Sequence, residues 1–143
     1  MTPCVRELRV TYTPTATGPL PSVGGPGSAA DILRTRLEHE PVEVCIVLLV
    51  NTKHHLLGVH ELSRGTLDTT LVHPRELFKV AILGNAAGVI VGHNHPSGDP
   101  EPSPDDVALC TRLRNAAAII GIDLLDFVIV GDGRYYSFKE AGR

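Results

Sequence analysis

The stretch GHNHPSGDPEPSPDD, residues Gly92–Asp106, decides how the rest of the chain is arranged. It follows the apolar run GVIV and leads into the helix-like sequence PDDVALCTRLRNAAAII, so it marks the end of a strand and the start of a helix. Ser103 is a suitable N-cap, Pro104 suits the first helical position, and Asp106 completes a capping box with Ser103. On this interpretation the stretch is only a strand end followed by a well-capped helix.

Two histidines in the same stretch favour a second interpretation. His93 and His95 lie two residues apart at the end of an apolar strand, so their imidazoles leave the same face of the chain and can converge on one point. Asp106 is a third possible ligand, preferred over Asp99 and Glu101, which lie in a proline-flanked loop of undefined direction. Two imidazoles and one carboxylate leave the fourth position of a tetrahedral Zn²⁺ open to water, the pattern of a catalytic zinc site.

Strands and helices alternate on both sides of this stretch, and their apolar spacing predicts the fold. The predicted elements are, in order, a strand VRELRVTYTP, a loop over residues 13–27, a helix SAADILRTRL, strands EVCIVLLV and HLLGVHEL, a helix HPRELFKVAILGNA, a strand GVIVGHN, a helix PDDVALCTRLRNAAAII, and strands IDLLDFVIV and RYYSF. Helical spacing places Ile82 and Ile120 on core-facing sides. We expect an α/β (α+β) fold in which helices pack on a mixed β-sheet, formed by one domain spanning residues 1–143.

Composition excludes several classes of protein. The 13 Lys and Arg against 16 Asp and Glu give a net charge of −3, which lacks the broad positive field that binding to phosphate backbones needs. No apolar run reaches the length of a membrane span, and the N-terminus lacks the pattern of a signal peptide. Cys4, Cys45 and Cys110 are far apart and odd in number, which argues against a disulfide framework. We therefore expect a soluble cytoplasmic protein.

The spacing of His93, His95, Ser103 and Asp106 resembles the motif of the JAMM metalloproteases, whose domain is also called MPN-plus or JAB. The amino-acid sequence is similar to those of one bacterial branch, the RadC family, in three stretches: GTLDTTLVHPREL, NAAGVIVGHNHPSGDPEPSPDD and LLDFVIVGDGRYYSF. The resemblance extends over about residues 5–138 and implies a JAB/MPN, cytidine-deaminase-like architecture. It also implies that the two histidines and Asp106 hold zinc and that Ser103 lies beside the metal.

The resemblance further implies a glutamate, ahead of the first core strand, that activates water. EVCIVLL resembles the family's Glu-led strand and points to Glu43, while Glu40, three residues earlier, is the rival. Asn94 stands between the histidines where eukaryotic deubiquitinating relatives carry Ser or Thr, so their substrate preference does not carry over.

The expected activity is zinc-dependent hydrolysis of a peptide or isopeptide bond in a peptide or protein substrate. Glu43 would act as general base and Ser103 as a hydrogen-bond donor to the oxyanion. The alternative is a noncatalytic DNA-repair-associated or protein-interaction module of the RadC family, which the intact set of His93, His95 and Asp106 disfavours. A nucleic-acid deaminase is a third class, but its Pro-Cys-x-x-Cys element is absent. The sequence leaves the oligomeric state open.

The net charge of −3 predicts weak, sequence-indifferent binding of nucleic acid at most. Fluorescence anisotropy with labelled single-stranded and double-stranded DNA, measured across a salt series, checks this expectation. Nanomolar affinity that persists at physiological salt would contradict it and support the DNA-repair alternative.

Overall fold

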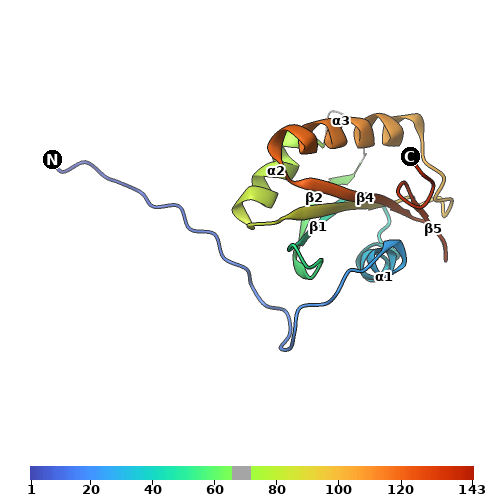
Figure 1. Cartoon of the computed structure of the whole chain (residues 1–143), viewed down its shortest axis with the longest axis horizontal. Helices are drawn as coiled ribbons and strands as arrows, with labels where there is room; N and C mark the ends of the chain where they lie inside the picture. The colour runs from blue at the N-terminus through green and yellow to red at the C-terminus, as the bar shows by residue number, and fades with distance from the viewer. Residues whose placement is uncertain (66–71) are drawn as a thin grey trace.

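The computed structural model describes residues 1–65 and 72–143, so residues 66–71 of the GTLDTTLVHPREL stretch lie outside the described residues. In the described part, helices cover both faces of a mixed five-stranded sheet, with α1 on one face and α2 and α3 on the other (Figure 1). The elements are α1 (Pro26–Leu37), β1 (Glu43–Val50), β2 (Leu56–Gly65), α2 (Pro74–Leu83), β3 (Gly88–Asn94), α3 (Pro104–Ile120), β4 (Asp123–Val130) and β5 (Tyr135–Ser137).

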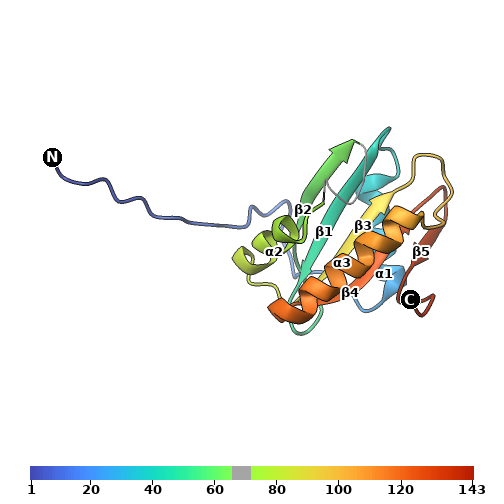
Figure 2. The same cartoon turned by 90° about the horizontal axis from the view of Figure 1, so that it is seen from above.

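The strand order in the sheet is β2-β1-β3-β4-β5. The strands β3 and β4 are parallel and are connected by α3, which lies over them in Figure 2, whereas the other neighbouring pairs are antiparallel. A parallel pair needs such a crossover connection, and an antiparallel pair does not. The sequence-based prediction of a mixed sheet with helices packed on it is confirmed.

The central strand β1 has a continuously apolar sequence because both of its faces are covered. Every residue of β1 after Glu43 is buried. Successive side chains alternate between faces, so Val47 and Leu49 join the core beneath α2 and α3, while Ile46 and Leu48 join the core beneath α1. Among the described helices, every one is too short or too polar to span a bilayer.

Local signals define where the helices begin, with one correction. As predicted, α3 begins at Pro104 after the N-cap Ser103. The predicted helix SAADILRTRL begins at Ser28, and this start is wrong, because α1 begins at Pro26. Ser28 lies in the first turn, where its Oγ accepts a hydrogen bond from the N–H of Gly25 at 3.1 Å. The proline supplies a helix-compatible φ angle two residues before the serine.

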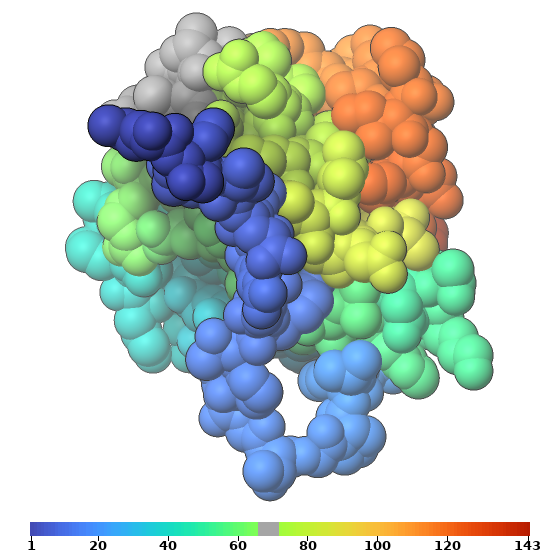
Figure 3. All heavy atoms as spheres, turned by 90° about the vertical axis from the view of Figure 1, so that its left-hand side faces the viewer, coloured from blue at the N-terminus to red at the C-terminus, as the bar shows by residue number. Residues whose placement is uncertain are grey.

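Three further predictions from apolar pattern are wrong. The VRELRVTYTP segment forms no strand of the described sheet; it belongs to an extended arm that projects from the body in Figure 1 and lies in front of the body in Figure 3. Leu8 in this segment is 79% exposed, and only near the end of the segment does Tyr12 contact the body, where its hydroxyl donates to the carbonyl of Gly84 at 2.6 Å. Ile82 and Ile120, expected to face the core, are 60% and 42% exposed at the ends of α2 and α3. Periodicity gives a helix face, but not how far the neighbouring sheet extends along it.

The close approach of α1 to the sheet predicts the effect of Gly92→Ala. A Cβ atom at Gly92 would lie 2.5 Å from both Cδ atoms of Leu33, which is fully buried in α1. We expect a loss of about 1 to 3 kcal/mol in the free energy of unfolding, the usual cost of overpacking a core. Urea denaturation followed by circular dichroism measures it.

The matched control is Gly24→Ala, since a Cβ atom there would meet nothing within 4 Å. Its effect on stability should be within about 0.5 kcal/mol. Equal unfolding midpoints for the two variants would show that α1 does not pack on β3 as described.

Candidate metal centre

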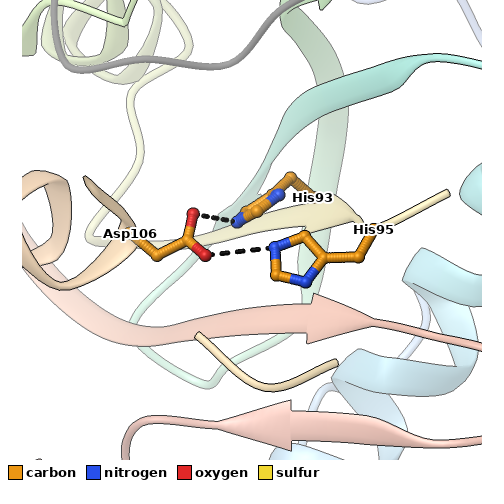
Figure 4. A group of neighbouring side chains, drawn as sticks. All are labelled: His93, His95 and Asp106. Carbon is orange, nitrogen blue, oxygen red and sulfur yellow. Dashed lines mark hydrogen bonds and ion pairs between the residues drawn. The ribbon is translucent and has the colours of Figure 1, made fainter. Parts of the chain in front are cut away.

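The predicted ligand residues come from three consecutive segments and meet at one point. His93 is on β3 and is fully buried, and it faces the core beneath α2 and α3, where its ring contacts Phe127 edge-on. His95 follows the strand, and its backbone N–H donates to the carbonyl of Val130 at 3.0 Å. Asp106 lies in the first turn of α3 and is only 4% exposed. Figure 4 shows both imidazoles pointing at the Asp106 carboxylate.

These three side chains lie close enough together to hold a cation. The Nε2 atom of His93 lies 2.9 Å from Oδ1 of Asp106, and the Nε2 atom of His95 lies 3.1 Å from Oδ2. One possible ligand atom from each residue lies within 4.8 Å of the other two, so the group could hold one metal ion. The structure therefore brings together the residues that the sequence predicted to converge.

The opposite nitrogen of each imidazole is turned toward a main-chain carbonyl. His95 Nδ1 lies 2.8 Å from the carbonyl oxygen of Asp99, and His93 Nδ1 lies 3.3 Å from that of Asn94. A carbonyl can only accept, so each Nδ1 is the donor and each Nε2 of a neutral ring carries a lone pair. Both lone pairs then face carboxylate oxygens, and the buried Nε2 of His93 has no hydrogen-bond partner among the described residues.

This arrangement of acceptors is repulsive unless a positive charge lies among them. A proton on an imidazole or a metal ion between the three residues satisfies it. In metal sites, the second ring nitrogen of a ligating histidine donates to a carboxylate or a backbone carbonyl, as both Nδ1 atoms do here. The donor set of two imidazole nitrogens and a carboxylate suits zinc. The residues present therefore fit a metal ion.

The capping box of α3 orients the aspartate. The N–H of Ser103 donates to Oδ2 of Asp106 at 2.8 Å, and the N–H of Asp106 donates to Oγ of Ser103 at 3.1 Å. The carboxylate is thus held from one side by the helix terminus and presented to the histidines on the other. The two interpretations of this sequence stretch, helix cap and metal site, use the same residues. The hydroxyl of Ser103 accepts in this pair and keeps its own proton to donate.

The loop before α3 holds His95 in place. Its turn is closed by the N–H of Gly98, which donates to the carbonyl of His95 at 2.9 Å, and it is attached to the β4–β5 connection by the N–H of Asp132, which donates to the carbonyl of Gly98 at 2.7 Å. Asp99, a rival ligand in the sequence, contributes its carbonyl to His95, while its carboxylate accepts from the N–H of Glu101 at 3.1 Å. The sequence cannot reveal that this main-chain carbonyl contacts His95, because every residue carries a main-chain carbonyl.

The two candidate glutamates have different surroundings. Cys45 pairs with His93 across the β1–β3 ladder, and side-chain alternation puts Glu43 on the same face of β1 as Cys45. The charge of Glu43 reaches His95, where it contributes to raising the pKa of the imidazole. Glu40 instead accepts two hydrogen bonds from Arg64, at 2.7 and 3.2 Å, in an exposed ion pair.

Electrostatics within the group follow from its geometry. Burial alone raises the pKa of Asp106, but its contacts with His93 and His95 outweigh burial and leave the pKa well below the ordinary value. The pKa of His95 is raised, chiefly by its hydrogen bond to Asp106 and against the opposing effect of burial. Burial, with a smaller effect from Asp106, raises the pKa of the Cys45 thiol to about 12, so this neighbour stays protonated near neutral pH.

Comparison with known proteins shows the family of the chain. The family described as the RadC-like JAB domain matches residues 23–143 of the chain. The chain belongs to the RadC family. The mixed sheet with three helices in its described part is consistent with a JAB domain, as the sequence resemblance implied.

Curated relatives of this RadC family member carry names that state no activity. UPF0758 protein ABC2615 of Shouchella clausii is 46% identical over 122 residues, which is 85% of this chain and 53% of the relative. A UPF0758 protein of Alkaliphilus oremlandii is 42% identical over 118 residues, covering 82% of this chain and 51% of the relative. One from Desulforamulus reducens is 54% identical over 97 residues, covering 68% and 43%. The chain spans about half the length of these relatives.

The convergent ligand geometry predicts about one zinc ion per chain. His93→Ala and Asp106→Asn should each lose most of the bound zinc, because two remaining ligands hold the ion weakly. His60→Ala, at an exposed histidine on β2, is the control and should retain it. Elemental analysis of dialysed protein measures the ratio, and full zinc retention in either site variant would remove that residue from the ligand set.

The raised pKa of His95 predicts how zinc binding depends on pH. Without metal, the pairing of His95 with Asp106 stabilises the fold fully below the unfolded-state histidine pKa of about 6.5, and this contribution is lost as pH rises through the raised folded-state pKa. Zinc competes with the same proton. The rise in Tm caused by excess zinc should therefore be larger at about pH 8 than at about pH 6.

Differential scanning fluorimetry at matched zinc concentrations tests this dependence. The Asp106→Asn variant is the control and should show little zinc-induced rise at either pH. An equal rise at both pH values in the unsubstituted protein would mean that zinc does not displace the His95 proton.

Proposed function

We propose that this RadC family member is a zinc-dependent metallohydrolase that cleaves a peptide or isopeptide bond. The observation that carries the proposal is that the Nε2 atoms of His93 and His95 converge on the Asp106 carboxylate. The Nδ1 atom of each ring lies within hydrogen-bonding distance of a backbone carbonyl oxygen. A purely structural zinc site closes all four ligand positions with protein atoms, whereas a three-ligand site suits catalysis. His93, His95 and Asp106 would hold the ion, which supplies Lewis-acid chemistry that polarises a carbonyl and lowers the pKa of water.

Glu43 is the proposed general base. Its position at the start of β1, on the face shared with Cys45, and its electrostatic effect on His95 support this role. Glu43 takes the proton from the attacking water and returns it to the leaving amine. The carboxylate of Glu40 accepts hydrogen bonds from the guanidinium of Arg64, and its pKa is lowered chiefly by hydrogen bonding to Arg64, which counts against Glu40 as the base. A carboxylate made less basic is a poorer proton acceptor.

Ser103 is proposed to stabilise negative charge on the substrate. Its side chain is exposed and lies at the N-terminus of α3, where the helix dipole also favours negative charge. Its hydroxyl donates to the carbonyl oxygen of the substrate as that oxygen becomes negative. The same residue keeps the Asp106 carboxylate oriented through its backbone N–H.

Replacement of the two glutamates tests the mechanism. Glu43→Gln should retain zinc and fold but lose activity on the order of 10² to 10⁴-fold, the usual contribution of a general base. Glu40→Gln, the matched control, should change the rate little. The measurement is hydrolysis of peptide and isopeptide-linked substrates, with zinc content determined on the same samples.

The reverse result, a collapse in Glu40→Gln with unchanged activity in Glu43→Gln, would transfer the role of base to Glu40. Unchanged activity in both variants would contradict the proposed mechanism.

A further inference from the structure

Where the backbone pairing of β1 with β3 ends, the buried side chain of Asn94 forms the next hydrogen bonds between the two segments. The pair formed by Cys45 and His93 is the end of the backbone register nearest the metal centre. Beyond it, Oδ1 of Asn94 accepts from the N–H of Val44 at 2.7 Å, and Nδ2 donates to the carbonyl of Val42 at 2.9 Å. Asn94 is only 4% exposed. One amide side chain therefore replaces the next step of the ladder and satisfies both a donor and an acceptor of the facing chain.

This contact connects the two halves of the proposed site. The backbone of Asn94 lies directly between His93 and His95, while its side chain holds the residues on either side of Glu43. Alternation along β3 points Asn94 away from the histidines, toward the face covered by α1. Asn94 is therefore placed to touch the chain that carries the base without occupying the space where a substrate would bind.

We propose that Asn94 is a positioning residue that sets the distance between Glu43 and the metal centre. The inference rests on the proposed function for its consequence in catalysis, but the positional claim stands on the hydrogen bonds alone. An amide is suited to this task because it offers a donor and an acceptor at once, and the facing segment presents one of each. A serine hydroxyl is too short to reach both, and alanine can form neither bond.

Asn94→Ser and Asn94→Ala are the test variants, with serine as the milder change that keeps a polar side chain. Asn51→Ala is the matched control. Asn51 follows β1 at its other end, and its Oδ1 accepts from the N–H of Lys53 at 3.0 Å and of His55 at 2.9 Å. Asn51→Ala thus removes two hydrogen bonds between an asparagine side chain and the backbone in the turn between β1 and β2, at the end of β1 away from the histidines.

The first measurement needs no catalytic activity. In metal-free protein, hydrogen exchange at the Val44 amide should accelerate on the order of 10-fold in the Asn94 variants, as expected for one lost hydrogen bond. In cobalt-loaded protein, the pseudocontact shifts of the amides of residues 42–44 should change in the Asn94 variants and stay unchanged in Asn51→Ala. Unchanged exchange and unchanged shifts in both Asn94 variants would overturn the proposal.

The second measurement asks whether Asn94 acts through Glu43. Asn94→Ser should lower kcat on the order of 10²-fold, the typical cost of a misplacement of about 1 Å, with KM and zinc content nearly unchanged. In the Glu43→Gln background the same change should cause no further loss, because the group it positions is gone. An equal loss in both backgrounds would show a general structural role and overturn the proposal.

The two measurements separate the failure of the proposal from the failure of the proposed function. Absence of any hydrolysis by the unsubstituted protein would count against the metallohydrolase, while exchange and cobalt shifts would still decide whether Asn94 holds the segment that carries Glu43.

Discussion

The candidate metal centre depends on one constraint, which is that the Nε2 atoms of two imidazoles face a single carboxylate. His93 and His95 cannot both turn Nε2 toward Asp106 as neutral rings without a cation among them, because carbonyls occupy both Nδ1 positions. The surrounding structure maintains this arrangement instead of relaxing it. Hydrogen bonds from the helix terminus restrain Asp106, and hydrogen bonds to the loop and to β4 restrain His95. Pairing of β3 with β1 and β4 restrains His93.

The fold explains how such an arrangement stays in place. His93 belongs to a strand buried on both faces, so its ring is restrained by core packing, and the β3–α3–β4 crossover brings the N-terminus of α3 back to the end of that strand. Asp106 then serves both as N3 of a capping box and as a partner of the histidines. Loss of that carboxylate would weaken both the cap and the site, which couples local helix stability to the metal centre.

Much of this could be predicted from the sequence, for physical reasons. A long apolar run such as EVCIVLLV identifies a strand covered on both faces, and the i, i+2 spacing of His93 and His95 identifies a shared face. The alternation around Leu8 predicts a strand that the described sheet does not contain, because alternation reports the potential for pairing and cannot supply the partner. The contributions of Asn94 and of the Asp99 carbonyl depend on which backbone groups remain unpaired, and only the assembled register defines those groups.

The most direct test of the central claim is anomalous diffraction at the zinc absorption edge from crystals of the zinc-loaded protein. The account predicts one strong peak at a bonding distance of about 2.0 to 2.2 Å from Nε2 of His93, Nε2 of His95 and a carboxylate oxygen of Asp106. A fully loaded protein whose zinc peak lies away from these three side chains, with the His93 and His95 rings still turned to Asp106, would contradict it.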